Sequence, residues 1–310
     1  MRIVIAFLKM AVPAVVVVIM ACSEETPLDD AKGKVPAFIA RWGWNGHNDG
    51  DFYLPRGVAV APNGNVYVAD TGNDRIQYFT PAGSFLGKWG LASEGWYPDR
   101  IAVAPNGAVY GTDRDGYRVL YFTDEGSLLG SWGSYGEGQG QFHKLTAVTV
   151  SPKGVVYVVD SSGRIQYFDG EGRYLGGWGK LGGGPGEFGY PTDINLGPNG
   201  NVYVVDAWDC RVQYFTPTGS YLGAWGSSGP GPGEFDHPVA VAVGEGGTVF
   251  VVDNGNRRVQ YFTSDGSFVG EFGSGGVGEG EFINPRGITI NERRVIYVVD
   301  AYCCWVQYFR

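Results

Sequence analysis

The stretch VYVADTGNDRIQYF, residues 66–79, decides the fold. Its first half alternates Val with other side chains and ends at Asp70, and its second half runs from the basic Arg75 to Phe79. Two short runs rich in β-branched and aromatic residues, separated by Thr-Gly-Asn-Asp, are typical of two antiparallel strands joined by a turn. The sequence therefore predicts neighbouring strands over residues 66–70 and 75–79.

This pattern recurs six times along the chain. Its aspartates are Asp70, Asp113, Asp160, Asp206, Asp253 and Asp300, at intervals of 43, 47, 46, 47 and 47 residues. A period of this size with several strand-like runs per copy is typical of β-propeller blades. After the amino terminus no segment has the period of a helix. We therefore predict an all-β, six-bladed propeller.

The flanking residues complete each copy. In the first copy, Phe52 and Pro55 precede an apolar run at 58–60, and a Pro-Asn-Gly turn at 62–64 follows. Beyond residue 79 a glycine turn leads to the run 85–89, which ends in Trp89. These runs predict four short strands per blade.

The order G-x-F-x-x-P, V-Y-V-x-D, R-I-Q-Y-F and F-L-x-x-W-G resembles the NHL repeat, and six copies cover about residues 36 to 310. The sixth copy stops at Phe309 and Arg310, after its third strand. The stretch from Phe38 to Gly43 matches the fourth strand of another copy, 85–90. We therefore predict that the amino-terminal strand completes blade six and leaves no unpaired end.

Residues 1–21 resemble the signal peptide of a bacterial lipoprotein. Arg2 and Lys9 lead into an apolar stretch that ends in Ile-Met-Ala-Cys at Cys22, like a lipobox. The resemblance implies a lipidated Cys22, a polar tether over 22–35 and a propeller over 36–310. An uncleaved anchor is the alternative, and either places the propeller outside the cytoplasm. Ser23 stands where inner-membrane lipoproteins often have Asp, which favours the outer membrane.

The charge of the chain argues against nucleic acid as a partner. Loss of residues 1–21 would leave 21 of the 23 basic residues against all 32 acidic ones. Affinity for a phosphate backbone rests mainly on Lys and Arg. Some animal NHL propellers bind RNA through a basic face, but this acidic chain is not expected to do so. We expect a monomer that contacts the membrane only through its lipid.

Three cysteines remain beside Cys22. Cys210 and Cys304 occupy the same position in blades four and six, which are too far apart for a disulfide. A bridge between the adjacent Cys303 and Cys304 is permitted outside the cytoplasm, but free thiols are the favoured interpretation. The sequence has no Cys-x-x-Cys pair, so the cysteines do not suggest a structural metal site.

Residue types that recur in every copy are interpreted as structural. The repeated Asp is expected to accept backbone N–H groups in the turn after its strand and to pair with the following Arg. In blade six Trp305 replaces that Arg, so Asp300 is either satisfied by the backbone alone or available for another role. We also expect packing between blades from the aromatic residue that ends each fourth strand: Trp42, Trp89, Trp132, Trp178, Trp225 and Phe272.

Function in a propeller is expected at the mouth of the central channel, where the repeat varies. The position after the Pro that precedes each first strand should point into this mouth. It holds Arg56, Asp99, Thr146, Thr192, Val239 and Arg286, with Arg100 and Asp193 beside them. Arg56 and Arg286 lie on adjacent blades and form either a paired cationic site for an anionic ligand or separate ion pairs with carboxylates such as Asp99.

An enzyme is the alternative, because six-bladed NHL-like propellers include the peptidyl-hydroxyglycine amidating lyases. That resemblance implies zinc-binding His directly after the same Pro, and none of the six positions holds His. His47, His143 and His237 lie two blades apart in different registers, which disfavours a shared site. A calcium-dependent lactonase or hydrolase that uses Asp99, Asp193 and Asn195 stays open. We predict no catalytic residue, metal or cofactor.

The second candidate surface is the set of loops after the repeated Asp. Blade four has Trp208 there and blade six has Tyr302, where other blades have small polar residues. Exposed aromatic residues beside Arg and Asp suit recognition of a peptide or a glycan, whereas side chains folded over their own blades would be structural. The sequence favours a binding or scaffold module for a protein, peptide or glycan of the cell envelope over a metal-assisted lyase or hydrolase.

Overall fold

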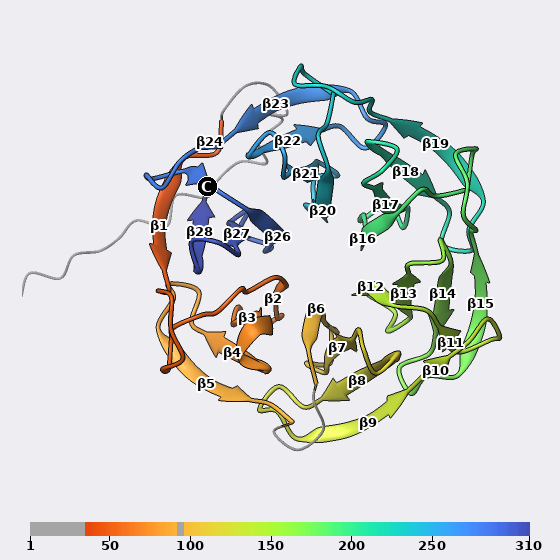
Figure 1. Cartoon of the computed structure of the whole chain (residues 1–310), viewed down its shortest axis with the longest axis horizontal. Coiled ribbons are helices and arrows are strands. Elements are labelled where there is room, and N and C mark those ends of the chain that lie inside the picture. Colours follow the sequence, from red (N-terminus) through yellow and green to blue (C-terminus); the bar gives the residue numbers. More distant parts are fainter. Residues whose placement is uncertain (1–34, 92–95) are drawn as a thin grey trace, which may run out of the picture. The chain divides into compact units, whose positions relative to one another are not determined.

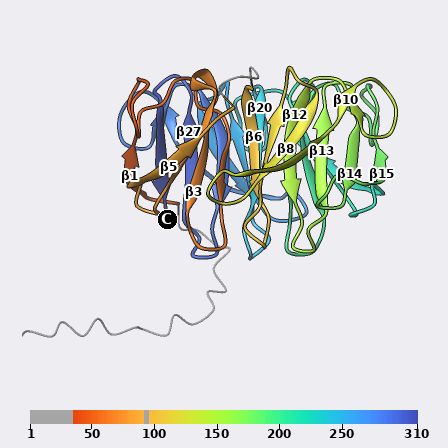
Figure 2. The ribbon, with the colours of Figure 1, turned by 90° about the horizontal axis from the view of Figure 1, so that it is seen from below.

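The computed structural model describes residues 35–91 and 96–310. From residue 35 onward the chain forms six four-stranded antiparallel sheets arranged as blades around a central channel (Figures 1 and 2). The predicted six-bladed, all-β propeller is confirmed. The proposed signal peptide, Cys22 and most of the proposed tether lie outside the described residues. Within the described residues, no helix is both long and apolar enough to cross a membrane.

Each of the first three blades begins at the channel and runs outward. Blade one consists of β2 (Val58–Val60), β3 (Val66–Asp70), β4 (Arg75–Phe79) and β5 (Phe85–Trp89), with the 3-10 turn η1 (Thr71–Asn73) after β3. Blade two consists of β6 (Pro98–Val103), β7 (Val109–Asp113), β8 (Arg118–Phe122) and β9 (Leu128–Trp132). Blade three consists of β12 (Leu145–Val150), β13 (Val156–Asp160), β14 (Ile165–Phe168) and β15 (Tyr174–Trp178).

The other three blades have the same order. Blade four consists of β16 (Pro191–Leu196), β17 (Val202–Asp206), β18 (Arg211–Phe215) and β19 (Tyr221–Trp225). Blade five consists of β20 (Pro238–Val243), β21 (Val249–Asp253), β22 (Arg258–Phe262) and β23 (Phe268–Phe272). Blade six consists of β26 (Pro285–Ile290), β27 (Ile296–Asp300), β28 (Trp305–Phe309) and β1 (Phe38–Trp42).

Short parallel pairs add to the loops that join one blade to the next. They are β10 (Ser134–Tyr135) with β11 (Gln141–Phe142) and β24 (Ser274–Gly275) with β25 (Glu281–Phe282). Each such interblade loop returns the chain from the outer fourth strand to the first strand of the next blade. These loops lie on the same face as the turns that follow the repeated Asp.

The core lies between neighbouring blades. The second strand of every blade is buried along its whole length, whereas the outer fourth strands keep exposed residues. Each aromatic residue that ends a fourth strand packs on the third-strand Phe of the next blade, as Trp89 does on Phe122 with ring centroids 6.0 Å apart. The expected packing between blades is confirmed for Trp42, Trp89, Trp132, Trp178, Trp225 and Phe272.

A glycine makes this packing possible. Gly126 in the blade-two turn has φ +93°, and a Cβ there would lie 2.5 Å from the Trp89 ring. A larger residue would therefore clash and also strain the backbone. The tyrosine of the second strand adds a polar link, since the Tyr67 hydroxyl donates to the Asp124 carbonyl of the next blade (3.1 Å).

The ring is closed by β1, as the sequence predicts. This strand pairs antiparallel with β28, so the first and last described strands share one blade. Its Trp42 ring lies 5.8 Å from Phe79 of blade one and 6.0 Å from Tyr297 of blade six. One residue of β1 therefore joins both sides of the closure.

Arg41 of β1 supplies a contact that blade six otherwise lacks. In blades one, three and four the third-strand Arg donates to an interblade-loop carbonyl, as Arg75 does to His47 (2.9 Å). Blade six has Trp305 at that position, and Arg41 instead donates to the Val277 carbonyl (3.0 Å) while its guanidinium lies 4.0 Å from the Trp305 ring centroid. The closing strand thus provides the cation for its own blade.

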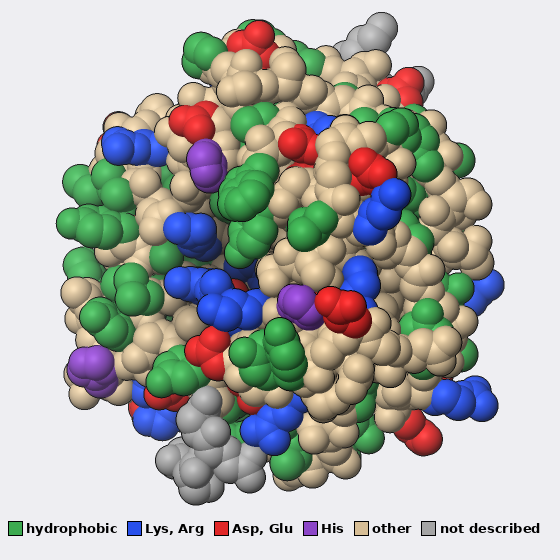
Figure 3. Space-filling view, turned by 45° about the vertical axis from the view of Figure 1, so that its right-hand side comes forward, with side chains coloured by type: hydrophobic (Ala, Val, Ile, Leu, Met, Phe, Trp, Pro, Cys, Tyr) green, Lys and Arg blue, Asp and Glu red, His purple; other side chains and the backbone are tan. Residues whose placement is uncertain are grey.

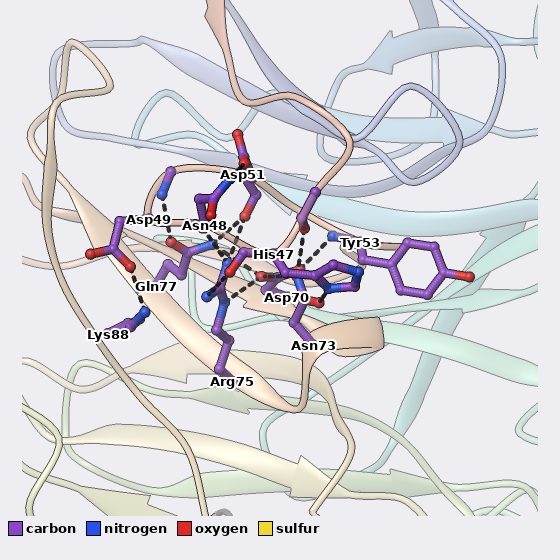
Figure 4. A network of polar contacts seen from close by, with 12 residues as sticks. His47, Asn48, Asp49, Asp51, Tyr53, Asp70, Asn73, Arg75, Gln77 and Lys88 are labelled. Carbon is purple, nitrogen blue, oxygen red and sulfur yellow. Dashed lines mark hydrogen bonds and ion pairs between the residues drawn. The ribbon is translucent and has the colours of Figure 1, made fainter.

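The repeated Asp and Arg form a structural clamp, drawn for blade one in Figure 4. Buried Asp70 accepts from Arg75 Nε (2.7 Å), Asn73 (2.8 Å) and the Tyr53 backbone N–H (2.7 Å). Burial raises the pKa of Asp70, and these donors oppose the rise. Arg75 also donates to carbonyls of the interblade loop, and Gln77 donates to Asp51 O (2.6 Å).

The clamp refines the expectation for the repeated Asp. Its pairing with Arg is confirmed, but its main backbone donor in blade one lies in the interblade loop, 17 residues upstream, rather than in the following turn. Asp206 likewise accepts from the Gly189 and Tyr190 N–H groups. In blades two and three the expected turn donor is present, since Gly116 N–H donates to Asp113 and Ser162 N–H to Asp160. In blade six, Asp300 accepts from the backbone N–H groups of Ile283, Asn284, Tyr302 and Cys303 and from the Cys303 thiol. Asp300 is therefore satisfied without an Arg.

The cysteines of the propeller are free thiols. Cys210 and Cys304 are buried, and each donates to the backbone of its own turn. Burial and the Asp300 carboxylate raise the pKa of Cys303 to about 12, so this thiol stays protonated near neutral pH. A thiol in that state is a poor nucleophile.

Candidate functional site

One face of the ring carries the interblade loops and the turns after each repeated Asp, and we call it the mouth face. Figure 3 views it obliquely: the three histidines, all in interblade loops, are visible. Lys and Arg side chains gather near the centre of this face, around a hollow. The chain as a whole has a net charge of −9, so this local cationic centre is unlike the rest of the molecule.

Arg56 lies at the mouth and pairs with a carboxylate. Its Nη1 is 3.3 Å from Asp99 Oδ1 of blade two, and the side chain is about one-third exposed. The expectation of separate ion pairs is therefore met for Arg56.

Arg286 stands beside Arg56 without such a pair. A Cβ at Gly287 would lie 2.3 Å from the Arg56 carbonyl oxygen, so glycine alone lets the first strands of blades six and one approach this closely. Burial lowers the pKa of Arg286, and the nearby Arg56 and Arg100 lower it further. Among residues 35–91 and 96–310, its guanidinium has no hydrogen-bond or ion-pair partner. The structure therefore places Arg56 and Arg286 close together, with Asp99 nearby.

Arg100 crosses the mouth. From blade two it donates through Nη1 to Arg56 O (3.3 Å) and through Nη2 to Val239 O of blade five (3.2 Å). Its Nε lies 3.9 Å from Asp193 Oδ1 of blade four and has no hydrogen-bond partner in the described chain. One long side chain therefore touches three other blades.

Asp193 is the buried acid of the mouth. It accepts from the Val241 N–H (2.9 Å). Burial raises its pKa to about 6, although Arg100 opposes the rise. Asp193 therefore changes charge just below neutral pH, and it is the group here best suited to take up a proton.

A cavity of about 260 Å³ lies along the channel axis next to Arg100 and Asp193. Most of the residues around it are aliphatic, but Arg100, Asp193, Thr149, Asn195 and Thr289 also line it, and the surface it exposes is mainly polar. This volume holds several waters or a small organic group.

The remaining predicted mouth positions are less exposed or already engaged. Thr146 is buried and donates to Val159 O (3.3 Å), while Thr192 donates to Pro238 O (3.4 Å). Val239 is buried and offers only its carbonyl, which Arg100 uses. The charged side chains at the mouth positions therefore come from blades one, two, four and six.

Exposed aromatic residues surround the charged centre. Trp208 is 69% exposed and stacks on Tyr190 of the preceding interblade loop, with ring centroids 5.6 Å apart and an interplanar angle of 27°. Trp208 thus folds toward its own blade and still presents a large surface to solvent. Tyr302 of blade six is 71% exposed.

Three residues of the mouth face escaped the sequence analysis: Tyr190, Arg114 and Lys144. Tyr190 precedes a first-strand Pro, and the phenol of Tyr190 lies within electrostatic range of Arg286. Arg114 follows the repeated Asp of blade two; the equivalent Thr71 donates to Pro98 O of the next blade (2.7 Å). A scan of the positions beside the repeated Asp and beside the residue that opens each first strand, which is Leu145 in blade three, would have found all three.

The histidines do not form a site together. His47 contacts Asn73, His143 lies 3.9 Å from Glu137, and His237 lies 3.3 Å from Asp236, each near its own loop. In the described part of the chain, no group of three or more His, Cys, Asp or Glu side chains is placed to hold a metal ion.

Comparisons with known proteins agree with this architecture. A model of the NHL repeat matches residues 52–79, and a family described as a 6-bladed beta-propeller matches residues 241–308. No curated protein matches the sequence. The chain therefore carries NHL repeats in a six-bladed propeller.

Solved structures resemble the fold at low sequence identity. A streptogramin B lyase aligns with a TM-score of 0.62 and 13% identity over 89% of this chain and 98% of its own. The virginiamycin B lyase from Staphylococcus aureus gives 0.59 and 15% over 87% and 98%. A protein of unknown function from Bacteroides thetaiotaomicron gives 0.69 and 18% over 89% and 76%. These likenesses establish the fold alone.

Proposed function

We propose that this propeller is a binding module that takes a carboxylate or other anionic group at the mouth of its channel. The observation that carries the proposal is Arg286. It is a partly buried guanidinium with two cationic neighbours, and among the described residues it has no ion-paired or hydrogen-bonded carboxylate, although Asp99 acts on it at longer range.

The charge balance at the mouth supports the proposal. Within the described residues, Arg56, Arg100 and Arg286 lie close to two carboxylates, Asp99 and Asp193, and Asp193 is partly protonated just below neutral pH. A desolvated cation is costly unless it is paired, so a bound anion would relieve the repulsion among the three guanidinium groups. Arg presents planar, two-pronged donors that fit a carboxylate.

Replacement of Arg56 and Arg286 by Gln in one protein is expected to weaken binding of citrate by about 100-fold, since charge-assisted hydrogen bonds contribute about 1.5–3 kcal/mol each. Titration calorimetry of the full-length protein in a mild nonionic detergent, at low salt, measures the change. The melting temperature should stay within a few degrees, because Arg286 has no ion-paired carboxylate to lose and Arg56 loses only a long, partly exposed pair with Asp99.

The matched control is the double substitution of Arg293 and Arg294 by Gln. These exposed arginines lie on the same blade as Arg286, in the turn between β26 and β27, at the end of the strands opposite to the mouth face. The control removes the same charge and should leave the affinity for citrate nearly unchanged. Equal losses in both proteins, or no affinity of the unmodified protein for any carboxylate tested, would refute an anion site at the mouth.

We further propose that the module is held in the cell envelope by lipid on Cys22, outside the cytoplasm and on the outer membrane, where its partner is a protein, peptide or glycan. The apolar stretch before Cys22 supports this. Cells fed radioactive palmitate should label the protein, and Cys22→Ala should abolish the label and release the protein from the membrane fraction. Undiminished labelling of Cys22→Ala contradicts the anchor.

A metal-assisted lyase or hydrolase is the second candidate. It is favoured by Asp193, whose pKa of about 6 and place beside the cavity suit a general base. Elemental analysis of the purified protein, with thermal melts in chelator and in added calcium or zinc, separates the two. Near-stoichiometric metal whose removal lowers the melting temperature favours the enzyme, whereas a melting temperature that neither chelator nor metal changes favours the binding module.

A further inference from the structure

The stack of Tyr190 and Trp208 is a feature that the blade itself does not require. The position two residues after the repeated Asp is Gly72, Asp115, Ser162 and Gly255 in four other blades. These small or polar residues complete the same turn, so an indole is not needed to build it. Trp208 nevertheless lies flat against Tyr190 and stays 69% exposed. A large aromatic surface in water that stabilises no core is more typical of a recognition surface.

This aromatic stack lies on the same face as the unpaired cation. The phenol of Tyr190 lies within electrostatic range of the Arg286 guanidinium, and the Tyr190 ring is in contact with Trp208. A surface from blade four toward blade six therefore includes all three side chains. A ligand that spans it meets a flat apolar face first and a positive charge next.

Further cations extend the surface on the other side of the mouth. Arg114 follows the Asp of blade two, and Lys144 precedes the first strand of blade three. The backbone of Lys144 is fixed on the mouth face, since its carbonyl accepts from Ser161 N–H (2.8 Å) in the turn after the repeated Asp160. Neither side chain has an ion-pair or hydrogen-bond partner within residues 35–91 and 96–310. Positive charge is therefore present at two separate places around the hollow.

The occupant that combines these features is a saccharide that carries carboxylates. A pyranose ring presents a flat C–H face that packs on an exposed indole, while a carboxylate on the same or the next ring is placed for a guanidinium. An acidic peptide carries charge but has no flat ring for Trp208. A nucleic acid needs more phosphate contacts than the free cations here supply, on a chain of net charge −9.

We propose that the mouth face binds an acidic glycan, with one sugar ring on Trp208, with a carboxylate of that ring or the next on Arg286, and with later carboxylates directed to Arg114 and Lys144. This inference rests on the anion site proposed above and narrows its ligand class. It adds the requirement that the aromatic stack contributes to affinity.

The test compares three probes on the full-length protein in a mild nonionic detergent: a galacturonate hexamer, a glutamate hexapeptide and a neutral glucose hexamer. Titration calorimetry and quenching of tryptophan fluorescence report binding. We expect the galacturonate hexamer to bind at least about tenfold more tightly than either other probe. Trp208→Ala should weaken galacturonate by about tenfold, as expected for loss of an exposed Trp at the centre of a contact, and should leave citrate unchanged.

Trp44→Ala is the matched control, because Trp44 is 72% exposed in an interblade loop and lies outside the stack. It should leave all affinities as they are. If the glutamate peptide binds as tightly as galacturonate and Trp208→Ala changes nothing, the glycan inference fails while the anion site stands. If none of the acidic probes binds, the anion site itself fails. Tighter binding of a single-stranded oligonucleotide would also overturn the glycan inference.

Discussion

Deletion of residues 36–43 is expected to unfold the propeller or to lower its melting temperature by more than about 15 °C. These residues contain β1, which supplies the fourth strand of blade six and pairs along its length with β28. Without it β28 becomes an open edge, and the ring loses the link between its first and last blades. Closure is what distinguishes a propeller from an open array of repeats.

The size of the effect follows from four contacts. Loss of Trp42 removes packing on Phe79 and Tyr297, and loss of this partly buried Trp is expected to cost up to about 3–5 kcal/mol. Loss of Arg41 removes its bond to Val277 O and its place over Trp305. Since whole domains are stable by only about 5–15 kcal/mol, these losses approach the total.

Thermal and urea denaturation followed by circular dichroism measure the change. Rescue provides the control: a synthetic peptide of residues 35–44, added in trans, should restore the transition in proportion to its concentration, and a scrambled peptide should not. A truncated protein that melts at the original temperature without peptide would mean that β1 does not close the ring.

The fold was predictable because every blade repeats the same local sequence pattern. The run before Asp70, the turn and the run after Arg75 each specify a strand, and six agreeing copies leave little choice of architecture. The closure was also predictable. The stretch around Trp42 matches the fourth strand of a blade, but the pattern of the first three strands does not precede it in the sequence. Such contacts are encoded by residues within one blade or in the same position of the next.

The candidate site was predictable only in part, because its contacts join unrelated positions. Arg56 and Arg286 were placed together by the adjacency of their blades. The reach of Arg100 to Val239 depends on a long side chain that crosses the channel, which no repeat pattern encodes. The stack of Tyr190 on Trp208 likewise joins two loops whose distance is set by the finished blade.

The clamps explain why the repeated Asp and the mouth residues have different roles. Asp70 and Arg75 satisfy each other and the surrounding backbone, so they have no free capacity for a ligand. Arg286 is in the opposite condition, with cations nearby and no anion bound among the described residues. The positions that vary along the repeat are therefore those where a ligand can supply the partner that a side chain lacks within its blade.

Asp70→Asn is expected to cost about 3–5 kcal/mol of stability, whereas Asp300→Asn should cost only about 1–2 kcal/mol. Both aspartates are buried and accept backbone N–H groups. Only Asp70 also neutralises an arginine, and removal of one partner from a buried ion pair leaves an uncompensated charge. Asp300 has Trp305 in that place, so its loss is limited to hydrogen bonds.

Urea denaturation of the two variants measures the difference, and the double variant Asp70→Asn/Arg75→Leu isolates its cause. Removal of the arginine as well should recover part of the loss, because no cation then remains buried without its partner. Equal losses for Asp70→Asn and Asp300→Asn, with no recovery in the double variant, would mean that the carboxylate acts through its backbone bonds alone. The arginine that recurs in blades one to five would then stabilise the interblade loop by its bonds to the loop carbonyls rather than by its charge.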